Sequence, residues 1–307
     1  MKRLKVIVPL LFVLAQMHGL SKGKEICLTF DRLPAMKPYG YWIPREISNM
    51  ILRGLAKYDI PTAGFVVEEK IDDDVASFVV LQDWAERGHT LGNNTYSYVD
   101  LNELSSDDFL EHVGDGQKYI RMATRATRAN YRFLRFPQLH EGNTKSKKKD
   151  VAKRLYRGDY KIVPATIVPS DFEFNRIYVG TSQGSEEIDQ LRKIYLSHVT
   201  EALTYAEEQS EKVFGRQVRH ILRLHVGIAT ANFVDSLIEL LKERGYEFVS
   251  LEEALSDPAY ATEEEYVGPL GLSFIDRVAA TRGLPYDPDH ARLSIGEIRN
   301  KISGAKP

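Results

Sequence analysis

The feature that most constrains the fold of this chain is its regular alternation of short β-rich runs with longer helical runs. Apolar residues at helical spacing separate successive runs of β-forming residues, and no internal repeat interrupts the order. Strands joined by helices pair in parallel, in an open or a closed sheet, and such sheets carry their functional sites at the carboxyl ends of the strands. The seven β-rich runs begin at Glu25 and continue at 62–67, 89–92, 131–136, 160–168, 220–226 and 246–251.

The helices between these runs have ordinary start and stop residues. Proline suits the first turn of a helix, serine caps helix starts, and glycine is common just past a helix end. These signals agree with the spacing of the apolar side chains. Helices are expected from Pro44, at 75–87 before Gly88, from Ser105 to about residue 123, at 185–214 before Gly215, and at 231–244 before Gly245.

The composition fits one globular domain. Of the 307 residues, 43% are hydrophobic and 27% are charged, which supplies enough apolar material for one core. One large α/β domain fits better than two small ones, because barrels of this class reach about 250 residues undivided. The formal net charge of -2 gives no general attraction to nucleic acid or to an anionic membrane, so neither is expected as a partner.

Residues 1–23 have the build of a secretory signal peptide. A basic start at Lys2, Arg3 and Lys5 precedes an apolar run, 6–15, that is too short to span a bilayer. We therefore expect a secreted or periplasmic protein whose mature chain has no membrane span. The alternative is an uncleaved amphipathic anchor, because no clear A-x-A cleavage site is present.

Cys27 is the single cysteine of the chain, so no intramolecular disulfide can form. It alternates with Thr29 and Asp31 on one side of the first β-rich run, which predicts a buried thiol. A nucleophilic role would require exposure beside a base.

The first β-rich run ends abruptly in polar residues. Asp31, Arg32 and Pro34 lie where a strand reaches the mouth of an α/β fold. The stretch from Thr29 to Pro34 resembles the first motif of the polysaccharide deacetylases (carbohydrate esterase family 4), T-F-D-D-x-P, with Arg32 in place of the second acid. Later motifs of the family are resembled, in order, by 62–67, 88–98, Arg135-Phe136-Pro137, Leu222-Arg223-Leu224-His225 and 244–251.

The resemblance covers residues 25–258 and carries expectations for fold and activity. It implies an irregular (β/α) barrel of about seven parallel strands at 24–258, with a C-terminal tail at 259–307 that packs on the barrel. It also implies metal-dependent removal of acetyl groups from N-acetylated sugars, which is hydrolysis of a non-peptide carbon-nitrogen bond. The partner would then be an acetylated oligo- or polysaccharide.

The positions that hold the metal in this family carry unsuitable side chains here. The resemblance places the ligands, one acid and two histidines, at Arg32, Asn94 and Tyr98. A divalent cation such as zinc needs deprotonated acids or neutral imidazoles, whereas arginine is a fixed cation, asparagine a weak ligand, and a phenol stays protonated near neutrality. We therefore expect no metal cofactor at these positions, and a water there would lack the lowered pKa that a metal gives it.

The metal-independent part of the family's catalytic set is present by position. The resemblance makes Asp31 the general base, His225 the general acid, Arg135 the residue that tunes the base, and Asp171 the acid of the fourth motif. Two plainer interpretations stay open. Asp31 would be a strand-end salt bridge with Arg32 or Arg135, and His225 a hydrogen-bonded core histidine.

The substitutions favour a binding pocket in place of a metal site. Arg32, held by Asp31, would put its guanidinium where the metal charge lies in the family, and the pocket would bind an acetamide, a carboxylate or a phosphate without hydrolysis. We therefore expect a glycan-binding protein that is catalytically silent or impaired. The residues expected to contact the glycan are Arg32, Asn94, Tyr98, Pro137 and His140, with plain surface exposure as the alternative for His140.

Two other functions stay open. The chain would be an active hydrolase if Asp31 and His225 act without a metal, or if His140 and His225 bind a relocated one. It would be a scaffold if only the barrel surface binds partners, in which case no pocket mutation has an effect.

Overall fold

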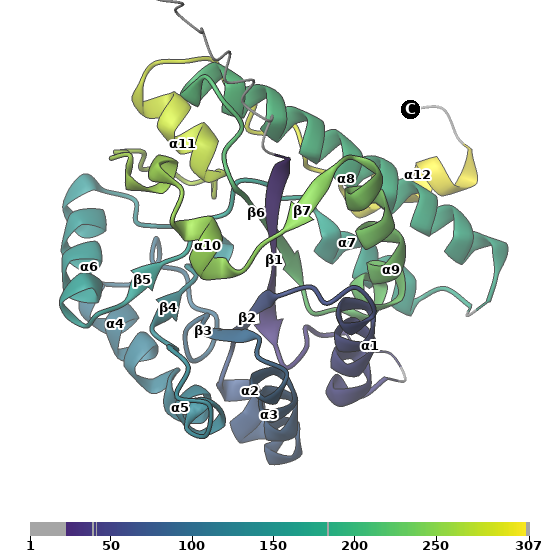
Figure 1. Cartoon of the computed structure of the whole chain (residues 1–307), viewed down its shortest axis with the longest axis horizontal. Coiled ribbons are helices and arrows are strands. Elements are labelled where there is room, and N and C mark those ends of the chain that lie inside the picture. The colour runs from purple at the N-terminus through teal and green to yellow at the C-terminus, as the bar shows by residue number, and fades with distance from the viewer. Residues whose placement is uncertain (1–22, 39, 41, 183, 305–307) are drawn as a thin grey trace, which may run out of the picture.

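Within the described residues, 23–38, 40, 42–182 and 184–304, the computed structural model has seven parallel strands in one curled sheet (Figure 1). The strands follow the order β5-β4-β3-β2-β1-β6, and β7 pairs with the first residues of β1. Ile167, beyond β5, forms a parallel bridge with Leu222 of β6, so the two edges of the sheet meet. The expected irregular barrel is therefore confirmed. The strands are β1 (Lys24–Leu33), β2 (Thr62–Val66), β3 (Thr90–Asn93), β4 (Phe133–Leu134), β5 (Lys161–Ile162), β6 (His220–His225) and β7 (Tyr246–Phe248).

Helices surround the sheet and follow its strands as the alternation predicts (Figure 1). The longest run, α8, has 29 residues; it begins after Ser185, which caps it by accepting from the Ile188 amide, and ends at Gly215 with φ 69°. The helices are α1 (Pro44–Lys57), α2 (Glu69–Asp73), α3 (Phe78–Glu86), α4 (Ser106–Asp115), α5 (Lys118–Thr124), α6 (Lys145–Arg157), α7 (Asp171–Val179), α8 (Glu186–Phe214), α9 (Ile228–Glu243), α10 (Leu251–Leu255), α11 (Phe274–Thr281) and α12 (Ile295–Ser303).

The alternating side chains of β1 separate two layers of core. Leu28 and Phe30 point outward and join the large cluster packed under the helices. Cys27 points inward and packs with Phe65 and Ile221 inside the barrel. The prediction of a buried thiol is confirmed, and burial raises the pKa of Cys27 to about 12. The inward face also carries the polar residues of the site.

The prediction of a single helix from Ser105 to about residue 123 is wrong. The chain forms α4 and α5 instead, separated at Gly116. A Cβ at Gly116 would lie 2.8 Å from the backbone of Thr95 and of Tyr96, so the chain passes close to the loop after β3 at this point. This close approach interrupts a run whose apolar spacing is otherwise helical.

The structure describes the C-terminal segment of the chain but almost none of the predicted signal peptide. The predicted signal peptide, 1–23, lies outside the described residues except for Gly23. No helix in the described part is long and apolar enough to cross a membrane. At the other end, α11 and α12 both contact α8, and Arg277 of α11 forms an ion pair with Glu141 in the loop after β4.

Candidate functional site

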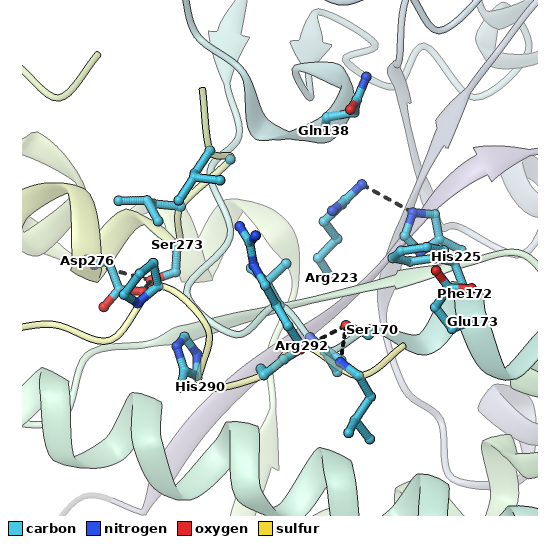
Figure 2. Close-up of a pocket in the computed structure, with 18 of the residues that line it drawn as sticks. Gln138, Ser170, Phe172, Glu173, Arg223, His225, Ser273, Asp276, His290 and Arg292 are labelled. Carbon is cyan, nitrogen blue, oxygen red and sulfur yellow. Dashed lines mark hydrogen bonds between the residues drawn. The ribbon is translucent and has the colours of Figure 1, made fainter. Parts of the chain in front are cut away.

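A cavity of about 680 Å³ lies at the carboxyl ends of the strands (Figure 2). One side comes from the barrel and the other from the C-terminal segment between Pro269 and Glu297. On the barrel side the lining includes the predicted residues Arg32, Tyr98, His140 and His225, and two that were not predicted, Gln138 and Arg223.

Strand pairing brings the polar residues of the site together. In the parallel register of β1 and β6, Asp31 lies opposite His225 and Thr29 lies opposite Arg223. Because side chains alternate along a strand, all four face the barrel interior. The register thus places two predicted residues, Asp31 and His225, beside an arginine that was not predicted.

Asp31 is fully buried between two guanidinium groups. Its Oδ2 accepts from Nε of Arg223 at 2.7 Å, and its Oδ1 accepts from Nη1 of Arg135 at 3.4 Å. Burial acts to raise the pKa of Asp31, but the charges of Arg223 and Arg135 outweigh it and lower the pKa below its ordinary value. Among the described residues no ion pair joins Asp31 to Arg32, so the expectation that Asp31 holds Arg32 is wrong: the partners come from β6 and from the residue after β4.

Arg135 occupies the barrel interior below Asp31. Its Nε donates to the carbonyl of Val163 at 2.7 Å, and its Nη2 donates to Oγ1 of Thr29 at 3.1 Å. Its guanidinium also lies over the ring of Phe65, 4.6 Å from the centroid. Burial lowers the pKa of Arg135 to about 10, so it stays charged at neutral pH. This residue therefore supplies Asp31 with a fixed cation.

Arg223 links the predicted site residues and was missed as a site residue from the sequence. Besides Asp31, its Nη2 donates to the hydroxyl of Tyr98 at 2.9 Å and contacts Nε2 of His225 at 3.1 Å (Figure 2). Burial acts to lower its pKa, but Tyr98 and Asp31 raise it above the ordinary value. Arg223 lies two positions before His225 on the same strand, so both side chains point to the same face of the sheet. This spacing could have identified Arg223 as a site residue from the sequence.

His225 and Asp171, each predicted as a site residue, form a hydrogen-bonded pair. Nδ1 of His225 donates to Oδ1 of Asp171 at 2.7 Å, and the backbone amide of His225 donates to Oδ2 at 2.6 Å. Thr230 adds a third hydrogen bond to the same carboxylate at 3.3 Å. The ring of Phe172 packs edge-on against His225. The imidazole is therefore held at both nitrogens, by Asp171 and by Arg223, and lines the cavity.

The three positions that the resemblance assigns to the metal do lie side by side. Asn94 accepts from the backbone amide of Arg32 through Oδ1 at 3.2 Å and donates to the carbonyl of Arg135 through Nδ2 at 3.0 Å. The guanidinium carbon of Arg32 lies 3.9 Å from the centroid of the Tyr98 ring. Arg32 and Tyr98 have φ values of 67° and 60°, a left-handed conformation that is uncommon outside glycine.

The loop after β4 supplies one rim of the cavity. Pro137 is buried behind this rim, while the next residue, Gln138, and His140 line the cavity. Nδ1 of His140 lies 2.7 Å from Oδ2 of Asp100, so the imidazole is held against the wall. Of the two interpretations of His140, substrate contact and plain exposure, its place in the lining is compatible with contact.

In comparisons with known proteins, part of the chain matches a family model, and most of the chain matches the fold of solved structures. The polysaccharide deacetylase family model matches residues 18–156. No curated protein matches the chain.

Several similar solved structures have TM-scores of 0.50 or above, and three of them are compared with this chain. Two are of a carbohydrate esterase family 4 pseudoenzyme from Bacillus anthracis. The mutant with restored enzymatic activity has a TM-score of 0.51 and 18% identity, and the match covers 77% of this chain and 69% of that one. The wild type has a TM-score of 0.50 and 18% identity, and the match covers 77% of this chain and 66% of that one. The third is a mutant of the peptidoglycan deacetylase PdaC from Bacillus subtilis. It has a TM-score of 0.50 and 17% identity, and the match covers 76% of this chain and 92% of that one. At these identities the structures show the fold alone. Residues 18–156 thus match the polysaccharide deacetylase family model, and the described chain has a curled parallel α/β barrel like that of the solved family 4 structures.

Proposed function

We propose that this protein binds an N-acetylated glycan in the cavity and does not hydrolyse it. The observation that carries the proposal is the position of Arg223, whose one guanidinium contacts Asp31, Tyr98 and His225. These are a former base, a former ligand position and a former acid in the family's scheme. One permanently charged guanidinium group therefore contacts the residues at the base, metal-ligand and acid positions of the family.

The three metal positions do not suit a divalent cation. Arg32 is itself a cation, and both polar side-chain atoms of Asn94 are already hydrogen-bonded to backbone groups. The hydroxyl of Tyr98 accepts from Arg223, which directs a positive group at the place where a metal ion would need a donor. Among the described residues, no group of three His, Cys, Asp or Glu side chains is placed to hold a metal ion.

Asp31 is a poor general base in this arrangement. A general base needs a carboxylate oxygen within reach of the water it deprotonates, and a pKa near the working pH. Each oxygen of Asp31 accepts from a guanidinium group, the side chain is fully buried, and the two arginines lower its pKa. The proton affinity of Asp31 is thus reduced where catalysis requires it to be raised.

His225 lacks the proton that a general acid must give. Arginine can only donate hydrogen bonds, so Nε2 of His225 accepts in its contact with Arg223. The imidazole proton then resides on Nδ1, which donates to Asp171. In this arrangement Nε2 directs its lone pair at Arg223 and offers no proton to a leaving amine.

The cavity nevertheless keeps features of a carbohydrate site. It has donors and acceptors on both sides and an aromatic ring, Phe172, that is 37% exposed beside His225. Cavities of about 300–1,000 Å³ with a few fixed polar groups are typical of small-ligand sites. We further propose that the protein is exported, on the basis of its signal-like start at 1–23.

The test combines binding, acetate release and metal content on one preparation of the chain. Chitotetraose, which is fully N-acetylated, is titrated by calorimetry and then incubated with the protein, with and without added zinc or cobalt. We expect heat of binding, no acetate, and no stoichiometric metal by elemental analysis. Acetate release that is abolished by Asp31→Asn would identify a working deacetylase, and an absence of binding would favour the scaffold alternative.

A further inference from the structure

Arg32 is a cation that faces the cavity without a protein counter-charge. Its guanidinium lies over the ring of Tyr98, with the central carbon 3.9 Å from the centroid, and its Nε is buried with no hydrogen-bond partner. No ion pair of Arg32 exists among the described residues. Its backbone is fixed on both sides, because Asn94 accepts from its amide and Lys70 donates to its carbonyl at 3.3 Å. The side chain is therefore held in place with its N–H donors unused.

The charges around Arg32 are mostly positive. Arg135 and Arg223 share the one carboxylate of Asp31. The pKa of Lys70 is lowered to about 7, first by burial and then by the charge of Arg32. In the described part of the chain, Arg135 and Arg223 thus share a counter-charge, whereas Arg32 and Lys70 form no ion pair.

The acids elsewhere in the lining are engaged on their own walls. Glu173 pairs with Arg176 one turn along α7 at 3.5 Å. Asp276 accepts from Ser273 at 2.7 Å at the start of α11. Glu297 accepts in the same way from the residue that caps α12. None of these carboxylates neutralises Arg32.

A half-buried guanidinium with free donors recognises an oxyanion. Stacking on Tyr98 covers the face of the group and leaves its edge, where the N–H fork matches the two oxygens of a carboxylate. A phosphate carries a charge of about -1.5 to -2 and usually takes several donors or a helix N-terminus. A single unpaired arginine suits a carboxylate better.

The C-terminal segment closes the groove in which a polymer would lie. At one rim the carbonyl of Gly268 accepts from Asn102 at 3.1 Å, and Gly271 passes so close to the carbonyl of Gln138 that a Cβ would overlap it. At the opposite rim Ser170 donates to the carbonyl of Ala291 at 2.9 Å. The segment thus spans from rim to rim, and Figure 2 shows its residues Ser273 and His290 across the cavity from His225.

We infer that the cavity takes the end of a short glycan that carries a carboxylate, and that Arg32 binds this carboxylate. The inference rests on the proposed glycan binding and names the class of ligand. A terminal sugar acid satisfies the free cation and fits a cavity that is closed on one side. The interior of a long polysaccharide does not fit such a cavity, even where the polymer carries carboxylates.

The test compares two tetrasaccharides of equal length by calorimetry. A hyaluronan tetrasaccharide alternates glucuronic acid with N-acetylglucosamine, whereas chitotetraose is neutral. Hydrogen bonds to charged groups are worth enough to give about ten- to hundred-fold in affinity, and we expect the acidic sugar to bind tighter by that factor. Arg32→Gln should remove this preference, and Arg32→Lys, which keeps the charge without the fork, should retain part of it. Arg121→Gln, on the exposed side of α5, is the matched control for loss of one positive charge and should leave it unchanged.

The outcomes separate the inference from the proposed function. Equal affinity for the two sugars, unaffected by Arg32→Gln, would overturn the inference and leave glycan binding intact. Failure of both sugars to bind would overturn the proposed function as well. Competition by inorganic phosphate at lower concentrations than free glucuronic acid would overturn the carboxylate assignment. Polymeric hyaluronan that binds as tightly per repeat as the tetrasaccharide would overturn binding at a chain end.

Discussion

Replacing Arg223 with methionine removes the central cation of the site while keeping most of its volume. Its ion pair with the fully buried Asp31 has a length of 2.7 Å. Opposite charges about 4 Å apart attract by roughly 4 kcal/mol at an effective dielectric constant of 20. Asp31 then retains Arg135, at 3.4 Å, as an ion-pair partner. Loss of one partner of a buried pair costs about 3–5 kcal/mol, so we expect the lower end, about 3 kcal/mol of unfolding free energy at pH 7.

The measurement is urea denaturation followed by circular dichroism, with Arg219→Met as the control. Arg219 pairs with Glu25 at 2.8 Å near the surface, and its loss should cost less than about 1 kcal/mol. The cost of Arg223→Met should also shrink in acid. The pKa of Asp31 is lowered in the folded state, so its ion pairs contribute stability above the unfolded pKa, and this is lost as the pH falls through the folded pKa.

A double-mutant cycle decides whether the ion pair itself is responsible. Asp31→Asn with Arg223→Met should cost less than the sum of the single changes by about 2–3 kcal/mol, because no uncompensated charge is left behind. Additive costs, or a loss below about 1 kcal/mol for Arg223→Met alone at pH 7, would refute the view that Asp31 and Arg223 neutralise each other in the barrel.

Three further predictions concern the metal positions, the buried carboxyl group of Glu68 and the thiol of Cys27. Restoring one acid and two histidines at the metal positions should give stoichiometric zinc by elemental analysis only when the central cation is removed too; zinc without that removal would contradict its blocking role. The variants are Arg32→Asp, Asn94→His and Tyr98→His combined, with and without Arg223→Leu. Burial raises the pKa of Glu68 from 4.5 to about 7, so stability should fall by about 3 kcal/mol as the pH rises from 4.5 to 7. Glu68→Gln should flatten that slope in urea melts at several pH values, and an unchanged slope would point to another group. The thiol of Cys27 should react with a thiol reagent only on unfolding, and rapid labelling of the native chain would contradict its burial.

The fold was predictable because its signals are periodic and local. Strands and helices alternate, and caps such as Ser185 and stops such as Gly215 depend on a few neighbouring residues. Inward-facing positions on β1 also followed from alternation, which is why the burial of Cys27 and the inward placement of Asp31 could be expected. The break at Gly116 could not, because it depends on contact with a loop distant in the sequence.

The site was predictable only in part. His225 and Asp171 were expected and form their pair. The partners of Asp31 were expected among Arg32 and Arg135, but the register of β1 with β6 adds Arg223 and excludes Arg32. The wall from the C-terminal segment could not be foreseen, since its contacts join residues more than 100 positions apart, such as Ser170 and Ala291.

The C-terminal wall also makes the cavity depend on residues that follow every strand of the barrel in the sequence. Residues 269–297 come after β1 to β7 in the sequence and add no strand to the sheet. The cavity exists only once the last residues have docked on the rims at Gln138 and Ser170. We therefore expect that displacing this segment from the rims would open the cavity while the strands of the barrel stay paired.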